Sequence, residues 1–447
     1  MGDLYQSQRA MREIRQRALQ GGAIAVLDIG TSKVACLVLR FDVPDLPGDD
    51  GAGPLAGQAN FRVIGAASTR SRGVRFGEID TMAETERAVR TAIQSAQKHA
   101  GQRVDHVIAC FSGARPASYG IAGDIDLPGG KVREADVGRV LAACDLPDIG
   151  PGREVLHAQP VNFALDNRTG LSDPRDHAGN RLAVDMHLLT VDAAVIGNLI
   201  YCIKRCDLEL AGLASSAYVS GIAALVEDYR KMGAACIDMG GGTTGVSVFI
   251  KNHMIFADAV RLGGDHVTAD VAAGLRLPLP VAERIKTLNG GVLATGKDDR
   301  EMIELVPEGA SETDDWAYDR RRVSRADLIG IMRPRIEEIL EEVRAILDAA
   351  GFDDMPTQQV VLTGGGCQVP GLDGLAARIL GHNVTMGRPL RIQGLPYAMT
   401  GPSFSAAVGL ALFAAHPQDE CWDFELPAER YPARSLRRAL RWFKQNW

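Results

Sequence analysis

Residues 234–248 have the sequence AACIDMGGGTTGVSV, in which an apolar run leads to an aspartate, three glycines, two threonines and a second β-branched run. This order predicts a strand, a tight turn and a returning strand. Glycines let backbone amides approach a ligand, and successive amides in such a turn form a concave anion site to which threonine hydroxyls add donors. Asp238, at the end of the first strand, is a candidate to hold a magnesium-bound water against phosphate. The stretch is therefore a candidate phosphate-binding hairpin.

The same order of residues occurs near the N-terminus. Residues 23–38, AIAVLDIGTSKVACLV, again place an aspartate, a glycine and hydroxyl side chains between two apolar runs. One glycine-rich hairpin is a weak signal, because most such turns are only turns, but two copies predict two related domains that face one another. Residues 360–372, VVLTGGGCQVPGL, predict a buried strand that ends in glycines before a helix, which can pass close to a nucleoside.

These three stretches, in this order, resemble the two phosphate motifs and the adenosine motif of the actin/Hsp70/sugar-kinase superfamily. Neither the Walker-A pattern nor the GxGxxG spacing of dinucleotide-binding folds occurs around them, which argues against both of those classes. The resemblance implies an α/β architecture, the actin-like two-lobed ATPase fold built from duplicated RNase H-like domains.

The resemblance also implies that Mg²⁺ and ATP bind between the two hairpins. The phosphates would contact one set of residues from each hairpin, namely Gly30, Thr31, Ser32 and Lys33, and Gly240, Gly241, Gly242 and Thr243. Asp28 and Asp238 would hold magnesium through water, and Asp238 would orient the attacking water. Backbone amides alone are an alternative to Lys33 as the phosphate contact. No general base is identifiable, so hydrolysis is expected to be slow at most.

The nucleoside would lie near three further stretches of the second half. These contain Gly263 and Gly264, the helical pair Glu283 and Lys286, and Gly364, Gly365 and Gly366. The family places a glutamate and a lysine at this spacing against ribose and adenine. A solvated ion pair one turn apart on a helix is the alternative for Glu283 and Lys286.

Length and composition place the chain among ordinary globular proteins. It has 447 residues, 46% hydrophobic and 23% charged, which is enough for two to four domains. A net charge of −7 gives no general affinity for nucleic acid. The eight cysteines form no CxxC pair and lie mostly in apolar runs, which favours buried thiols in a reducing cytoplasm. No apolar run reaches the roughly 18 residues needed to span a bilayer.

The pattern of elements predicts several segments along the chain. The first actin-like domain is expected at 22–102 and 188–231, completed by a helix at about 400–415, and it is interrupted at 103–187 by a small inserted domain of order strand, helix, strand, strand. The second domain is expected at 232–265 and 354–400, with a small subdomain at 266–353. Residues 1–21 are expected to be a basic arm, either frayed or contacting a partner or lipid. Residues 416–434 are expected to be a linker.

The last segment, residues 435–447, has the pattern of an amphipathic helix. At 100° per residue, Leu436, Leu440, Phe443 and Trp447 share one stripe, Arg437, Arg438, Arg441 and Lys444 lie opposite, and Trp442 lies at the border. A basic face, an aromatic-rich apolar face and too short a length to span predict a helix in the interface of an anionic membrane. A helix docked on the chain's own core is the alternative.

The hairpins, the inserted domain and this tail together resemble the bacterial FtsA family of cell-division proteins, as do the GLASS run at 212–216 and residues 331–335. The resemblance implies a protein that polymerises and tethers filaments of the tubulin-like FtsZ to the cytoplasmic face of the inner membrane at the division site. It would recruit later division proteins through the inserted domain. The FtsZ tail would bind near Arg321, Arg322, Arg325 and Arg333, for which a solvated basic patch is the alternative.

Three other classes share parts of this pattern. A small-molecule kinase of the same superfamily would have no use for a lipid-binding tail. A chaperone of the Hsp70 type would need a peptide-binding domain, for which the residues after 415 are too few. A pilus-assembly actin-like protein shares much of the fold and would bind an inner-membrane partner instead of a tubulin-like tail.

Overall fold

The computed structural model describes residues 3–20, 22–41, 61–305, 322–355 and 357–426. Arg321, the Pro- and Gly-rich loop at 44–57 and the amphipathic helix expected at 435–447 lie outside the described residues. Within these described ranges, no helix combines the length and the apolar character needed to cross a lipid bilayer.

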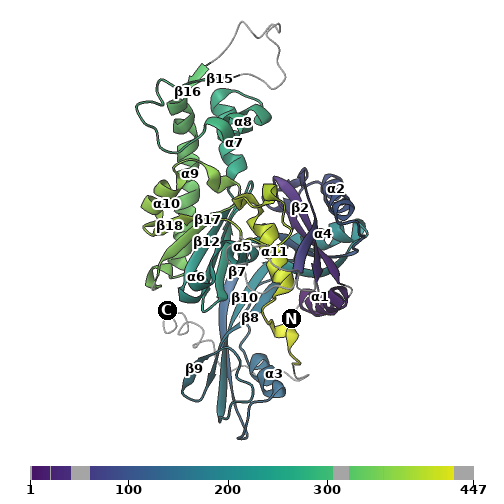
Figure 1. Cartoon of the computed structure of the whole chain (residues 1–447). Helices are drawn as coiled ribbons and strands as arrows, with labels where there is room; N and C mark the ends of the chain where they lie inside the picture. The colour runs from purple at the N-terminus through teal and green to yellow at the C-terminus, as the bar shows by residue number, and fades with distance from the viewer. Residues whose placement is uncertain (1–2, 21, 42–60, 306–321, 356, 427–447) are drawn as a thin grey trace, which may run out of the picture.

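Two five-stranded sheets with the same topology form the centres of two lobes (Figure 1). The first has the order β11-β6-β1-β2-β3 and consists of β1 (Ala23–Ile29), β2 (Lys33–Phe41), β3 (Phe61–Arg70), β6 (His106–Phe111) and β11 (Glu209–Ser215). The second has the order β14-β13-β12-β17-β18 and consists of β12 (Ala234–Met239), β13 (Thr244–Ile250), β14 (His253–Val260), β17 (Gln359–Thr363) and β18 (Asn383–Met386).

The repeat in the sequence corresponds to a repeat in the strand pairing. The central strand of each sheet pairs antiparallel with the strand that follows its hairpin and parallel with the strand on its other side. Asp28 and Asp238 therefore occupy equivalent positions, near the ends of β1 and β12. The expected duplication is confirmed.

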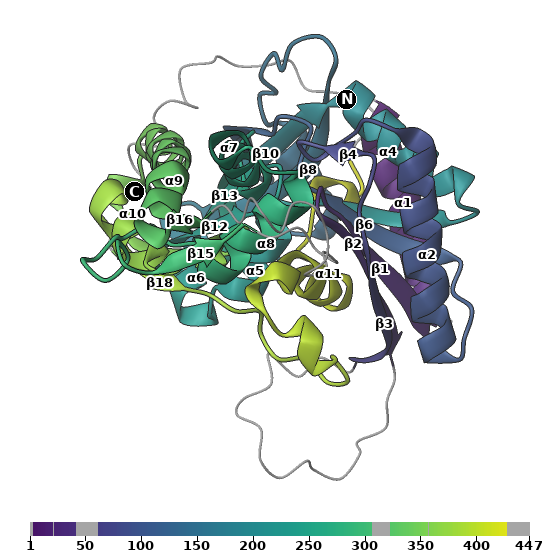
Figure 2. The ribbon, with the colours of Figure 1, turned by 90° about the horizontal axis from the view of Figure 1, so that it is seen from above.

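Two apolar helices, α5 (Ser216–Ala224) and α11 (Ser405–Ala415), pack against each other between the sheets (Figure 2). Nearly all of their residues are buried, as is typical of helices that are apolar on every side. A Cβ added at Gly409 would lie 1.7 Å from the Val219 carbonyl oxygen, so glycine is what lets the two backbones approach. The lobes thus share a close-packed centre.

The remaining helices of the lobes cover the outer sides of the sheets. On the first lobe these are α2 (Met82–Ala100) and α4 (Ala193–Arg205), whereas the short ribbon β4 (Val74–Arg75) and β5 (Glu78–Ile79) reaches the second lobe, where Glu78 pairs with Arg261. On the second lobe they are α6 (Glu227–Met232), α9 (Arg325–Ala349) and α10 (Leu372–Leu380). The upper part of α9 continues into a small subdomain with α7 (Gly264–Leu275), α8 (Leu279–Asn289), β15 (Met302–Glu304) and β16 (Arg322–Ser324). Pro334 lies inside α9, which is one continuous helix.

The inserted domain is a four-stranded sheet that extends from the opposite end of the molecule to the small subdomain (Figure 1). It has the order β7-β10-β8-β9 and consists of β7 (Ala117–Asp126), α3 (Glu134–Ala142), β8 (Arg153–Leu165), β9 (Arg168–Leu171) and β10 (Arg181–Asp192). The expected start at 103 is wrong, because the strand predicted at 104–111 is β6 of the first sheet. Its apolar run is buried between two parallel neighbours, as in a central strand.

The N-terminal segment is a docked helix, α1 (Asp3–Gln20), so the expectation of a frayed arm is wrong. Met11 and Ala18 are buried against the first lobe. The Arg12 guanidinium lies 2.7 Å from the Asp423 carboxylate, and Arg15 donates to the Phe413 carbonyl at 3.2 Å. Apolar packing and arginine contacts together therefore fix a helix whose composition is largely polar.

The chain after α11 is also packed, so the linker expected at 416–434 is wrong up to residue 426. We refer to residues 417–426 as the strap. Its short helical turn η6 (Cys421–Asp423) and Phe424 place buried side chains in the core of the inserted domain. The strap runs from the end of α11 toward α3 (Figure 1). Residues 427–434 lie outside the described residues.

Candidate functional site

The two predicted hairpins close with the same backbone hydrogen bond and face each other across the lobes. The Gly30 amide donates to the Lys33 carbonyl at 3.0 Å, and the Gly240 amide donates to the Thr243 carbonyl at 2.9 Å. Each turn follows the central strand of its own sheet. The duplicated sheets thus bring two equivalent turns to one place.

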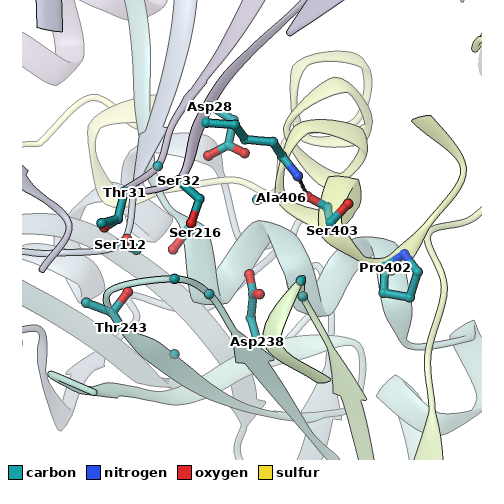
Figure 3. A pocket seen from close by; sticks show the side chains of 17 residues that line it. Asp28, Thr31, Ser32, Ser112, Ser216, Asp238, Thr243, Pro402, Ser403 and Ala406 are labelled. Carbon is teal, nitrogen blue, oxygen red and sulfur yellow. Dashed lines mark hydrogen bonds between the residues drawn. The ribbon is translucent and has the colours of Figure 1, made fainter. Parts of the chain in front are cut away.

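A cleft between the hairpins contains most of the predicted phosphate residues (Figure 3). It leaves about 100 Å³ of free space. The predicted residues that line it are Asp28, Gly30, Thr31, Ser32, Lys33, Asp238, Gly240, Gly241, Thr243, Gly364 and Gly365.

Asp28 and Asp238 point toward each other across the cleft from opposite lobes (Figure 3). Burial raises the pKa of the Asp28 carboxyl to about 6, although the charge of Lys33 opposes this. Burial also raises the pKa of Asp238, against the hydrogen bond from Ser220 and the charge of Lys33. Two desolvated carboxylates beside one lysine form a site that a further cation would stabilise.

This donor set fits a magnesium ion held through water. Hard oxygen ligands suit Mg²⁺, which usually keeps several waters and binds one or two carboxylates plus phosphate. Across the described residues, no three His, Cys, Asp or Glu side chains gather into a metal site. The ion would therefore depend on the two aspartates, water and phosphate oxygens.

Lys33 is held by the loop that precedes α11. Its ammonium donates to the Ser403 carbonyl and lies 3.9 Å from the centroid of the Phe404 ring. Burial lowers the pKa of Lys33, and the charges of Asp28 and Asp238 oppose this. A phosphate contact through Lys33 would therefore compete with the Ser403 carbonyl.

The glycines of the second hairpin are required because the hairpins touch. A Cβ added at Gly241 would lie 2.1 Å from the Ser32 hydroxyl oxygen and 3.0 Å from the Asp265 carboxylate. A Cβ at Gly242 would lie 2.6 Å from the Thr31 hydroxyl oxygen. Real Cβ atoms do not approach this closely, so these turns form a cradle that suits a small, oxygen-rich ligand group.

Of the predicted nucleoside residues, Gly364 and Gly365 line the cleft, whereas Glu283 and Lys286 do not. The Lys286 ammonium donates to the Gly264 carbonyl at 3.0 Å and to the Thr268 hydroxyl at 2.8 Å, and lies 2.7 Å from the Glu283 carboxylate. The ion pair considered as the alternative is thus present, beside the N-terminus of α7. A nucleoside contact for this pair stays a prediction.

The remaining glycines of the set lie against the second phosphate hairpin. Cβ atoms added at Gly263 and Gly366 would lie 2.6 Å and 3.2 Å from the Gly240 carbonyl oxygen. Gly364 has φ +91°, and a Cβ there would lie 2.3 Å from the Asp238 carboxylate. The glycines of residues 364–366 therefore lie directly against the Asp238 carboxylate of the second hairpin.

Several lining residues were not predicted from the sequence. Ser112, Ser216, Gly245, Pro402, Ser403 and Ala406 complete the cleft. Ser112 follows β6, which runs parallel to β1, so its position after a buried strand was an available signal. Ser403 carries no local motif and lies there because α11 brings the end of the chain back between the lobes.

The basic cluster proposed for the FtsZ tail is largely neutralised in the structure. The carboxylates of Glu304, Asp298 and Glu337 lie 2.7, 2.7 and 2.8 Å from Arg322, Arg325 and Arg333, respectively. All three arginines lie on β16 and α9, in and beside the small subdomain. A peptide would have to compete with these carboxylates, and the site stays a prediction.

Family models match two parts of the chain. The model for "Cell division protein FtsA" matches residues 235–409, and the model for the SHS2 domain inserted in FtsA matches residues 113–190. The cell division protein FtsA of Agrobacterium fabrum is 40% identical over 394 residues, which cover 87% of this chain and 86% of that protein. The chain belongs to the FtsA family. The FtsA of Pseudomonas aeruginosa is 29% identical over 436 residues, covering 96% of this chain and all of that protein.

Membership of the FtsA family makes this a cell-division protein and decides against the kinase and pilus alternatives. A solved PilM–PilN type IV pilus biogenesis complex is similar with a TM-score of 0.56, covering 88% of this chain and 99% of that one. At 16% identity this likeness shows the fold alone. The predicted actin-like two-lobed fold with an inserted domain is confirmed.

Proposed function

We propose that this FtsA-family chain binds Mg²⁺-ATP between its two hairpins, polymerises, and anchors FtsZ filaments to the cytoplasmic face of the inner membrane. One observation supports this most strongly. Two equivalent glycine turns and two buried carboxylates converge on a single cleft between the lobes.

Different residues of the cleft would contact the phosphates and the magnesium ion. Amides and hydroxyls of residues 30–33 and 240–243 donate to phosphate oxygens from the two lobes. Asp28 and Asp238 hold Mg²⁺ through water, and Ser220 positions the Asp238 carboxylate by a hydrogen bond. Bound Mg²⁺ neutralises phosphate charge. Asp238 orients water, and without a clear general base the turnover is slow, so ATP acts mainly as a ligand that sets the angle between lobes.

The proposed membrane anchor is the basic amphipathic segment at 435–447. One such helix binds an anionic surface weakly, but a filament presents many copies, so polymerisation raises avidity. The FtsZ tail is proposed to bind the small subdomain near Arg322, Arg325 and Arg333, and later division proteins the inserted domain. These partners would place the protein at the division site.

Co-sedimentation with anionic liposomes tests the anchor. A variant with both Trp442→Glu and Phe443→Glu should lose sedimentation, because one charge then enters the apolar stripe and another lies at its border, while its ATP binding stays unchanged. Deletion of residues 435–447 serves as the reference for complete loss. FtsZ added to the assay should be found in the pellet with the wild type and in the supernatant with the variant. Unchanged sedimentation of the variant would remove the membrane proposal.

A further inference from the structure

The strap is attached through Gln418 to α5 and to the second lobe. Its side-chain oxygen accepts a hydrogen bond from the Tyr218 hydroxyl at 3.0 Å, and its amide nitrogen donates to the Asn252 carbonyl at 2.5 Å. Tyr218 lies on α5, between the lobes, and its ring stacks on Phe249 of β13, whereas Asn252 lies in the β13–β14 turn of the second lobe. One side chain of the strap therefore joins the helix between the lobes to the edge of the second sheet.

Glu420 attaches the strap to the inserted domain. The Ser215 amide donates to His157 Nε2 at 3.2 Å, so Nδ1 carries the imidazole proton and donates to the Glu420 carboxylate at 2.7 Å. The Ala158 amide donates to the other carboxylate oxygen at 2.6 Å. His157 and Glu420 are both buried, so loss of either partner leaves an unsatisfied polar group.

The far end of the strap is held by α1 and α3. Asp423 pairs with Arg12 of α1, and Trp422 and Phe424 belong to the core of the inserted domain. A Cβ added at Gly138 of α3 would lie 2.1 Å from the Glu425 carbonyl oxygen, so this helix has a glycine where the strap backbone passes. The strap is thus seated along its length, immediately before the segment that leads to residues 435–447.

We propose that the strap is a mechanical link that couples the position of the second lobe to the inserted domain and α1, and so to the base of the C-terminal segment. Gln418 contacts α5, the helix that contributes Ser216 to the cleft and holds the Asp238 carboxylate through Ser220. A consequence of this link is that nucleotide binding changes the position from which the C-terminal segment leaves the globular part, and that consequence rests on the proposed function. The existence of the link does not rest on the proposed function.

Hydrogen exchange on the full chain, without nucleotide or lipid, tests the link from both ends. Gln418→Ala should speed exchange of the α1 amides, and Arg12→Ala should speed exchange of the Lys251 and Asn252 amides. The expected change is about fivefold, the factor that one neutral hydrogen bond contributes. Asp419→Ala and Arg9→Ala are matched controls, because both residues are exposed neighbours of the altered positions, and exchange should stay at the wild-type rate. If each variant affects only its own end, the link is overturned.

Gly138→Ala adds one methyl group and tests whether the strap packs against α3. The added Cβ meets a backbone oxygen, so the strap should lift and chymotrypsin should cut at Trp422 and Phe424 several-fold faster. Gly197→Ala in α4 is the control, because a Cβ there meets nothing within 4 Å. Equal cleavage rates for Gly138→Ala and the wild type would contradict the packing of the strap against α3.

Added Mg²⁺-ATP separates the link from the proposed function. Nucleotide binding is measured first, with a fluorescent ATP analogue. If ATP binds, it should change strap exchange in the wild type and less so in Gln418→Ala, and an unchanged wild-type strap would refute the coupling. If ATP does not bind, the proposed function fails, and the exchange experiments without nucleotide still decide the link.

Discussion

The surroundings of His187 determine its protonation state. His187 of β10 is fully buried, and its Nε2 lies 3.0 Å from the Ser118 hydroxyl. That hydroxyl donates to the Ala257 carbonyl, so His187 Nε2 is the donor to Ser118 and the imidazole is neutral. Burial lowers the pKa of His187 to about 3. The inserted domain therefore meets the second lobe through a histidine that must stay uncharged.

This state predicts a loss of stability in acid. Between its pKa of about 3 in the folded protein and the ordinary histidine pKa of 6.5, His187 binds a proton more readily when unfolded, so the unfolding free energy falls as pH drops below 6.5. At pH 4.5 the loss is roughly 3 kcal/mol, from two pH units at 1.36 kcal/mol each. His187→Gln should remove this part of the pH dependence in denaturant titrations at pH 7.5 and 4.5. An identical acid slope in the variant and the wild type would contradict the assignment.

Gly241 and Gly330 offer a contrast between two glycines. Gly241→Ala places a Cβ against Ser32 and Asp265 and should force the hairpins apart, weakening nucleotide binding on the order of tenfold, as overpacking commonly costs 1–3 kcal/mol. Gly330→Ala lies in α9 with nothing within 4 Å of the new atom, and should stabilise the helix by roughly 0.5–1 kcal/mol without changing affinity. Fluorescence titration of both variants measures the difference. Equal affinities would refute the cradle.

At the scale of elements, the sequence predicted best what is local and worst what depends on distant partners. Both glycine hairpins, the kind of fold and the buried helix at 405–415 follow from residues adjacent in sequence. The docking of α1 does not, because Arg12 finds its partner 411 residues away. The composition of the strap, which is acidic and contains a proline, predicts a linker, but three of its side chains complete the core of the inserted domain.

The docking of α1 predicts unequal effects of two neighbouring substitutions. Met11 is 6% exposed, so Met11→Ala should lower the free energy of α1 opening by about 2 kcal/mol or more, the usual cost of truncating a buried side chain. Arg9 is exposed, and Arg9→Ala should change the free energy of α1 opening by less than about 0.5 kcal/mol. Hydrogen exchange of the α1 amides measures both. Similar exchange in the two variants would mean that the helix is not held by its apolar face.

At the scale of the whole molecule, a duplicated sheet brings two equal turns together and two shared helices hold them there. The inserted domain and the small subdomain extend to opposite ends (Figure 1). The start of the inserted domain was not predicted correctly, because membership of a sheet depends on pairing with strands that are distant in the sequence: β6 pairs with β1 of the first sheet, whereas β7 pairs with β10 of the insertion. Most of the cleft, by contrast, follows from its motifs, and the further lining residues come from the second hairpin's own returning strand, from α5 and α11, and from the segments after β6 and before α11.

The central claim is that the two hairpins hold one Mg²⁺-nucleotide between the lobes. Calorimetric titration of ATP into the full chain, in Mg²⁺ and in a chelator, tests it most directly. We predict saturable binding of one ATP per chain that is stronger with Mg²⁺, and that Asp238→Asn removes the effect of Mg²⁺. No saturable binding, or binding that neither Mg²⁺ nor Asp238→Asn changes, would contradict the account.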